Sequence, residues 1–110
     1  MTRRIALCVP SLPLSGVGTS VGIIYSGLRD AGYDAEVVVT GAELGDDFDR
    51  AVKNGWVIQP VGHGIRFLPH RLKRIVECLK AYDVVINNAS FETQMVFPCL
   101  PNEVLRISVV

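Results

Sequence analysis

Short apolar segments set the narrowest limit on how this chain can fold. Residues 5–9 (IALCV) form a continuous apolar run of strand length. A strand whose side chains do not alternate between apolar and polar is buried on both faces, which is typical of a parallel sheet covered by helices. Further strands are predicted at residues 35–39, 56–61, 84–86 and 104–110, and Pro60 weakens the third of these segments or places it at an edge of the sheet.

Helical patterns alternate with these strands. Apolar residues at positions 21, 24, 25 and 28 repeat at helical spacing and predict a helix that begins near Ser20. Ala31 and Gly32 end this helix, because glycine readily adopts the left-handed conformation that follows a helix. The clearest stripe in the sequence predicts a helix over residues 68–79, with Pro69 in its first turn. Shorter helices are predicted at residues 46–53 and 90–97.

The alternation of strands and helices predicts an α/β, Rossmann-like three-layer domain over residues 1–110. We expect a parallel sheet of about five strands, in the order 3-2-1-4-5, with helices on both faces. Ligands of such sheets bind beyond the carboxyl ends of the strands, where the strand order reverses. This point lies between the first and fourth strands, so the loops at residues 10–19 and 87–91 are the expected site, with Gly62-His63-Gly64 nearby.

The loop after the first strand, PSLPLSGVGT, contains Gly16 and Gly18 just before a predicted helix. Glycines let the backbone approach a ligand, and free N–H groups at a helix start favour an anion such as phosphate. The alternative is that both glycines only permit a tight turn. The spacing of Gly16, Gly18 and Gly22 differs from that of a dinucleotide fingerprint, and the absence of lysine excludes a P-loop.

The charge, the cysteine content and the acidic residues of the chain argue against several classes of function. The chain has 11 basic and 11 acidic residues, and a formal net charge of zero argues against bulk electrostatic binding of nucleic acid. Its three cysteines form neither a C-x-x-C pattern nor a Cys/His cluster, which disfavours a disulfide framework and fits a reducing cytoplasm. The acidic residues at positions 46–49 lack the spacing of a calcium loop, so no metal is expected. We expect neither a signal peptide nor a membrane span.

The segment RIALCVPSLPLSGVGTSVGIIYSGLRDAGYDAEVVVT resembles the opening of GT-B glycosyltransferases, in particular the retaining, nucleotide-sugar-dependent family 4 enzymes. The resemblance rests on the turn at residues 15–18, the corner Ala31-Gly32-Tyr33-Asp34, and the later segments YDVVINNASF and VLRISVV. It implies an N-terminal, acceptor-side domain that closes against a C-terminal donor-binding domain absent from this sequence. Because the last predicted strand runs to Val110, we expect the domain to be incomplete and inactive in transfer by itself.

The resemblance also implies which residues bind substrate. Four residues of the first loop would lie near the donor diphosphate: Gly16, Val17, Gly18 and Thr19. Asn88 and Ser90 would border the acceptor cleft. Ser11 and His63 are assigned to the same cleft from their places after the first and third strands. For His63 the alternative is an ordinary loop histidine, and for Asn88 a residue that simply ends a strand. A nucleotide-sugar would be the substrate and no further cofactor is expected.

Other function classes stay open. The chain is alternatively a non-catalytic Rossmann-like module that binds a nucleotide or a partner protein. A nicotinamide oxidoreductase is disfavoured by the glycine spacing. Basic residues surround the helix at residues 68–79, on the face opposite its apolar stripe: Arg66, Arg71, Lys73, Arg74 and Lys80. They form either a solvated face or a peripheral contact with an anionic membrane. Exposed apolar surface on an incomplete domain would promote self-association.

Overall fold

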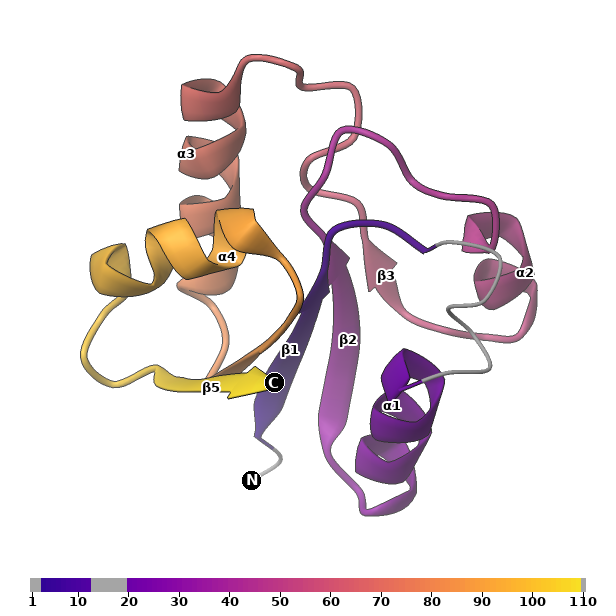
Figure 1. The fold of residues 1–110 in the computed structure, drawn as a ribbon. Coiled ribbons are helices and arrows are strands. Elements are labelled where there is room, and N and C mark those ends of the chain that lie inside the picture. The colour runs from indigo at the N-terminus through magenta and orange to yellow at the C-terminus, as the bar shows by residue number, and fades with distance from the viewer. Residues whose placement is uncertain (1–2, 13–19, 110) are drawn as a thin grey trace.

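Strands and helices alternate along the part of the chain that the computed structural model describes, residues 3–12 and 20–109 (Figure 1). The strands are β1 (Arg4–Val9), β2 (Asp34–Val39), β3 (Ile58–Gln59), β4 (Val84–Asn88) and β5 (Leu105–Val109). The helices are α1 (Ser20–Asp30), α2 (Phe48–Lys53), α3 (Leu68–Leu79) and α4 (Phe91–Val96), and the short 3-10 helix η1 (Phe97–Cys99) follows α4.

The sheet has the strand order β3-β2-β1-β4-β5, and every neighbouring pair is parallel. This confirms the predicted fold class and strand order. β1 lies at the centre, where Cys8 is in register with Val38 of β2 on one side and Asn87 of β4 on the other. The chain therefore reverses its direction of strand addition between β1 and β4, as a Rossmann-like sheet does.

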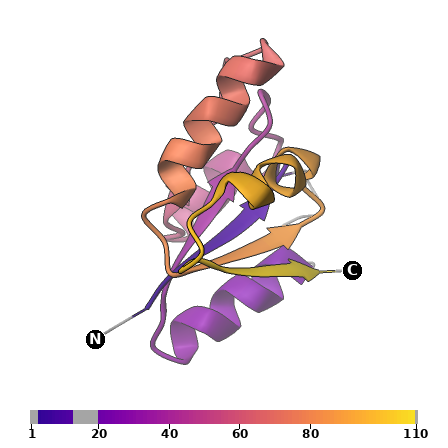
Figure 2. The same ribbon diagram turned by 90° about the vertical axis from the view of Figure 1, so that its left-hand side faces the viewer.

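Alternate residues of β1 face two hydrophobic layers. Ile5, Leu7 and Val9 pack in the layer that α1 and α2 cover, whereas Ala6 and Cys8 pack in the layer that α3 and α4 cover. None of these five side chains is more than 4% exposed. Figure 2 shows α1 on one side of the sheet and α3 with α4 on the other. The continuous apolar run in the sequence thus corresponds to a strand that is buried on both faces.

Helix α1 ends and packs as its sequence predicts. Gly32 has a φ of 92°, and the N–H groups of Gly32 and Tyr33 donate to the carbonyls of Arg29 and Leu28, at 3.0 and 3.1 Å. These are the two bonds of a Schellman motif, which a left-handed glycine allows.

Two aromatic rings also pack in the layer that α1 covers. Tyr25 stacks on Trp56 with 4.7 Å between ring centroids, and the Tyr25 hydroxyl accepts a 2.9 Å hydrogen bond from the Val57 N–H. Trp56 is partly buried against this core, so it serves packing.

The strand β3 is shorter than predicted. Of the expected residues 56–61, only Ile58–Gln59 pairs with β2 as a strand. Pro60 follows immediately and has no N–H to donate, so the ladder stops there. On the other side, Trp56 leaves the sheet to stack on Tyr25. β3 is consequently a short edge strand.

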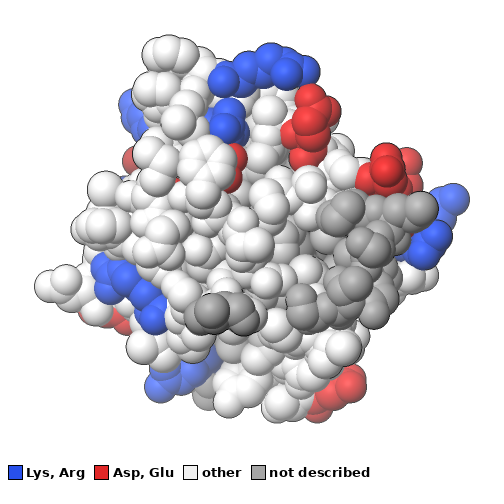
Figure 3. Space-filling view, in the orientation of Figure 1, with Lys and Arg blue, Asp and Glu red and all other residues white. Residues whose placement is uncertain are grey.

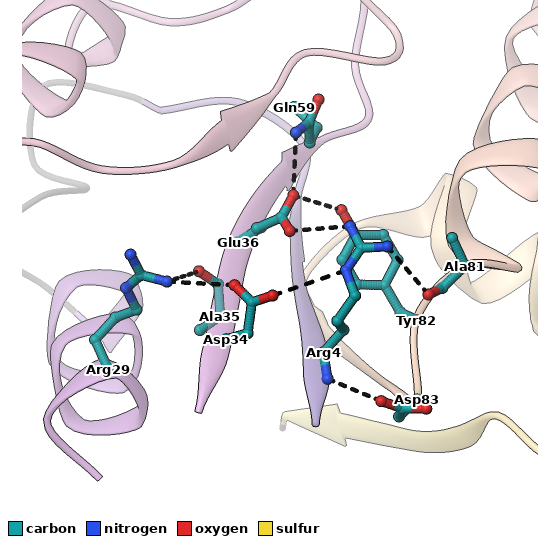
Figure 4. Close-up of polar contacts among 9 residues, drawn as sticks. All are labelled: Arg4, Arg29, Asp34, Ala35, Glu36, Gln59, Ala81, Tyr82 and Asp83. Carbon is teal, nitrogen blue, oxygen red and sulfur yellow. Dashed lines mark hydrogen bonds and ion pairs between the residues drawn. The ribbon is translucent and has the colours of Figure 1, made fainter. Parts of the chain in front are cut away.

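Glu36 places a carboxylate inside the sheet. It lies on β2, is 6% exposed and faces the α3 layer, since its neighbour two residues on, Val38, packs there. Its Oε1 accepts hydrogen bonds from Gln59 Nε2 (3.0 Å) and from the Tyr82 hydroxyl (2.9 Å). Its Oε2 pairs with Arg4 Nη2 at 3.0 Å (Figure 4). One side chain thereby connects β1, β2, β3 and the segment before β4.

The network keeps Glu36 charged. Burial acts to raise the pKa of Glu36, but hydrogen bonds from Arg4, Gln59 and Tyr82 outweigh it and hold this pKa below its ordinary value of 4.5. The hydrogen bond to Glu36 likewise raises the pKa of Arg4. Burial raises the pKa of the Tyr82 hydroxyl, which stays protonated and able to donate. The Arg4 guanidinium also lies over the Tyr82 ring, 4.5 Å from its centroid.

Replacing Glu36 by alanine should lower the free energy of unfolding by about 2–3 kcal/mol, because the buried Tyr82 hydroxyl loses its acceptor and Arg4 loses its partner. Equilibrium urea denaturation measures this loss. Asp34→Ala is the matched control on the same strand: its side chain is 45% exposed and reaches Arg29 and Arg4 only at 3.5 and 3.9 Å. That control should lose less than about 0.5 kcal/mol. Equal losses for both variants would contradict a central role for Glu36.

Acid should weaken the fold through the same carboxylate. Because the pKa of Glu36 is lower in the folded chain than its ordinary value of 4.5, its ionised form stabilises the fold above that value. This contribution is lost as the pH falls from about 4.5 through the folded-state pKa. Urea denaturation of the wild type and Glu36→Gln between about pH 7 and pH 3 tests this: the difference between them should shrink with acid. A difference that stays constant over this range would refute the assignment.

Candidate functional site

The point where the strand order reverses lies at the carboxyl ends of β1 and β4. The four residues assigned to the donor diphosphate, Gly16, Val17, Gly18 and Thr19, fall outside the described residues. Both flanks of that loop are described: Leu12 is fully buried, and α1 starts at Ser20. The two flanks are therefore the end of the central strand and the amino end of a helix that packs against the sheet.

The loops after β1, β2 and β3 are joined by backbone hydrogen bonds into a rim along this end of the sheet. Gly41 N–H donates to the Pro10 carbonyl at 3.0 Å, and Leu12 N–H donates to the Leu44 carbonyl at 2.8 Å. Gly62 and Gly64 continue the pattern with donations to the carbonyls of Val39 (3.3 Å) and Ala42 (3.1 Å). The rim thus holds three loops in fixed positions beside the candidate site.

Glycines are required where the loops of the rim touch. A Cβ at Gly62 would overlap the carbonyls of Thr40 and Gly41, and a Cβ at Gly45 would overlap the backbone of Leu12. Gly45 also has a φ of 93°, in the region that side chains disfavour. The glycines therefore allow backbone-to-backbone contact between neighbouring loops.

A chain of buried hydroxyl groups connects α4 with β2 and β1. The Thr40 hydroxyl donates to the Val9 carbonyl at 3.2 Å and lies 2.6 Å from the Ser90 hydroxyl. Ser90 Oγ also accepts from the Thr93 N–H (3.2 Å) and from the Thr93 hydroxyl (3.0 Å). Since the one hydrogen of Thr40 goes to Val9, the hydrogen between Ser90 and Thr40 belongs to Ser90. The hydroxyl hydrogens thus point in a single direction, from Thr93 through Ser90 and Thr40 to Val9.

Ser90 is therefore a positioning residue. It is 1% exposed, caps α4 and uses its hydroxyl in contacts within the chain. Its backbone N–H donates to Asn87 Oδ1 at 2.9 Å, which closes the turn between β4 and α4. Between these two residues, Ala89 has a φ of 68°, a conformation that costs an alanine about 1 kcal/mol or more. The turn is sharp and held from both ends, so Asn88 leaves β4 in a defined position.

Of the residues assigned to the acceptor cleft, two lie at the ends of neighbouring strands. Ser11 follows β1 and Asn88 ends β4, and both are half-buried. Within the described residues, the side chain of Asn88 forms no hydrogen bond. His63 is exposed in the turn after β3, so β2 separates its strand from β1. The structure thus brings Ser11 and Asn88 to the reversal point and leaves His63 on the far part of the rim.

Arg71 is more buried than predicted: the sequence pattern placed it on the outward basic face of α3. Its side chain is only 11% exposed, and Nη2 lies 3.2 Å from Glu92 Oε2. Its Nη1 also donates to the Ile65 carbonyl at 2.8 Å. The helical spacing could have indicated this burial, because Arg71 is four residues before the buried Ile75 and therefore lies on the same face of α3. Glu92, 2% exposed in the first turn of α4, is the partner that allows this burial.

The rest of α3 follows the prediction. Ile75 and Leu79 are fully buried, whereas Lys73, Arg74 and Lys80 are exposed on the opposite face. Charges of both signs lie mainly toward the margins of the face that Figure 3 shows, and its middle is largely uncharged. This face therefore presents no broad basic surface.

The Cys8 thiol and the possible metal ligands of the described residues can be judged from burial and spacing. Cys8 is fully buried on β1, and burial raises the pKa of its thiol to about 12, so the thiol stays protonated. Within residues 3–12 and 20–109, no three His, Cys, Asp or Glu side chains gather in a way that would hold a metal ion. In the same part of the chain, no helix combines the length and apolarity needed to cross a membrane.

Comparisons with known proteins found no counterpart. A scan against protein-family models gave no match, and neither a search of curated proteins nor a search of solved structures found a similar chain.

Gly62→Ala should destabilise the rim. The new methyl group would overlap the carbonyls of Thr40 and Gly41, and moving the loop apart should cost about 2 kcal/mol. Gly27→Ala in α1 is the matched control, since a Cβ there meets nothing within 4 Å and should raise the free energy of unfolding by about 0.5–1 kcal/mol. Chemical denaturation compares the two variants. A neutral Gly62→Ala would show that the loops do not need this close contact.

Proposed function

We propose that this chain is the acceptor-side, N-terminal domain of a GT-B glycosyltransferase that transfers a sugar from a nucleotide-sugar donor to an acceptor. The observation that carries the proposal is the reversal of strand order between β1 and β4. The two segments that follow these strands are the glycine-containing loop at residues 13–19 and the polar end of β4 at Asn88. A Rossmann-like sheet binds its ligands at this position.

The loop between β1 and α1 would serve the donor. Glycosyl transfer breaks the bond between the anomeric carbon and a diphosphate oxygen and forms a bond from that carbon to an acceptor oxygen. Negative charge grows on the leaving diphosphate as the first bond breaks, and backbone N–H groups that face it would stabilise the transition state. Gly16 to Thr19 and the free N–H groups at the start of α1 would supply those donors. This chemistry requires no metal ion.

The end of β4 would serve the acceptor. Asn88 is half-buried, forms no side-chain hydrogen bond with another described residue and offers both a donor and an acceptor, which suits a sugar hydroxyl. Ser11 at the end of β1 would line the same side. Ser90 would act through Asn88, because its cap and its contact with Thr40 fix the turn that carries Asn88. His63 would contact only an acceptor long enough to pass over β2.

The second domain of such an enzyme would supply the remaining donor contacts, so this chain should bind nucleotide weakly and catalyse no transfer. We propose a cytoplasmic location, because Cys8, Cys78 and Cys99 are all free thiols and nucleotide-sugars would serve as the donor. A non-catalytic module with the same fold would share the nucleotide site but would have no use for a separate acceptor contact at Asn88.

Titration of the isotope-labelled chain with a nucleoside diphosphate, followed by NMR, tests the donor site. We expect chemical-shift changes at residues 16–20 and at the end of β1, with an affinity on the order of millimolar because half of the contacts are missing. Inorganic sulfate at matched ionic strength controls for binding of any anion. Shift changes confined to residues away from 15–20 would refute the donor site.

The acceptor site is tested on the same sample. Asn88→Ala should leave the nucleotide-induced shifts at residues 16–20 in place while it abolishes shifts at β4 caused by simple sugars. Ser26→Ala, on the exposed part of α1, is the matched control and should change neither response. Nucleotide binding without any sugar response at β4 would favour the non-catalytic module.

A further inference from the structure

β5 forms one edge of the sheet and has an uncovered face. It pairs with β4 on one side, and no strand lies beyond it in the described sheet. Figure 2 looks at this edge, with β5 in front of the other strands. Leu105, Ile107 and Val109 are 55%, 40% and 37% exposed, although Val84 and Ile86, the register partners of Leu105 and Ile107, are buried in the α1 layer. Helix α1 thus covers the centre of the sheet and leaves β5 open.

The hydrogen-bonding groups of this edge can be assigned from the register. Leu105 N–H donates to the Asp83 carbonyl of the strand entry at 3.0 Å, so Leu105 faces β4 with its backbone groups. Backbone direction alternates along a parallel strand, so Ile107 and Val109 also face β4. The N–H and carbonyl groups of Arg106 and Ser108 therefore point outward.

The edge lacks the devices that keep edge strands apart. Its sequence, LRISV, contains neither lysine nor proline. Its one charged side chain, Arg106, is turned onto the carbonyls that follow α4. It donates to Phe97 (2.8 Å), Leu100 (2.5 Å) and Pro101 (3.1 Å). An apolar stripe and a row of unpaired backbone groups are thus presented, while the guanidinium of Arg106 is held against its own chain.

We propose that β5 pairs with β5 of a second copy of this chain, antiparallel, about a two-fold axis that passes through Ile107. In this register Arg106 of each copy lies opposite Ser108 of the other, and the two pairs exchange four backbone hydrogen bonds. Ile107 faces Ile107, and Leu105 faces Val109, so the exposed stripes of both copies merge on the α1 side. The two sheets become one continuous sheet.

A second copy fits this edge because the edge is complementary to itself. The chain has no net charge to oppose association, and the guanidinium of Arg106 is already bonded within its own copy. Only five residues of each copy take part. Stable interfaces bury at least about 1,200 Å² in total and use about 20–30 residues a side, so the dimer should be weak. A dissociation constant on the order of 10–100 μM is expected. The edge lies outside β4, so the end of β1 stays open.

Sedimentation velocity over a concentration series, up to about 1 mM, tests the dimer. Ser108→Pro removes an outward N–H and leaves the β4 ladder intact, because proline is tolerated where an edge N–H faces solvent. We expect Ser108→Pro to remain monomeric, whereas Ser108→Ala, which keeps the N–H, should associate like the wild type. Circular dichroism verifies that both variants are folded. A wild type that stays monomeric throughout, or a folded Ser108→Pro that dimerises as well as the wild type, would overturn the proposal.

A second pair of variants keeps the test decisive if Ser108→Pro does not fold. Ile107→Lys puts two ammonium groups at the two-fold axis and should abolish association, while Val52→Lys on α2, 49% exposed, should not. The register is tested in a Cys99→Ser background, which removes an exposed thiol. Ile107→Cys should then form an intermolecular disulfide on mild oxidation, because directly opposed residues of this pair type lie within bridging distance, whereas Leu105→Cys should not. Equal cross-linking by both would refute the two-fold register.

Discussion

The carboxylate of Glu36 is the contact on which the amino half of the sheet depends. Burying a charge inside a sheet is costly unless hydrogen bonds replace its water, and Arg4, Gln59 and Tyr82 provide three of them. These partners come from β1, β3 and the segment before β4, which are far apart in the sequence. A hydrophobic residue at this position would pack, but it would not select these three partners. The ionic contact thus specifies which elements meet as well as how firmly they do so.

The two ends of the sheet are built differently. Charged groups hold the amino end, where Arg4 connects Glu36 and the Asp83 carboxylate, which accepts the Arg4 N–H at 2.8 Å. At the carboxyl end, the loops are held mainly by backbone hydrogen bonds of the rim and by hydroxyl groups such as Thr40 and Ser90. The ion pair of Arg71 with Glu92 also lies at this end, in the first turn of α4. The loops that would face a ligand are thus fixed largely by backbone and hydroxyl contacts.

Much of the fold was predictable from sequence because its signals are local. The apolar run at residues 5–9 is a central strand, and Gly32 ends α1 in the predicted conformation. The end of β3 at Pro60 follows from the sequence, but its start does not, because Trp56 stacks on Tyr25 of α1 instead of continuing the strand. The burial of Arg71 likewise depends on Glu92, 21 residues away on another helix. The sequence predictions were wrong where a residue's contact with a distant part of the chain outweighed the local sequence pattern.

The candidate site shows the same limit. Its place at the ends of β1 and β4 follows from the strand order, which the alternation of elements predicts. The role of Ser90 did not follow, because its exposure depends on α4 and its hydrogen bonds on Thr40, 50 residues earlier. Sequence alone thus located the site but could not separate residues that face a ligand from those that hold the turn.

Because Trp56 stacks on Tyr25, its fluorescence reports on the folding of one half of the molecule. The chain has a single tryptophan, and it lies in the layer that α1 covers, next to the edge strand β3. Its emission reports on that layer alone, while circular dichroism reports on all helices together. If both signals change at the same denaturant concentration, the two halves unfold as one cooperative unit. If the tryptophan signal changes first, the α1 layer opens while α3 and α4 remain folded, and stability must be assigned to each half separately.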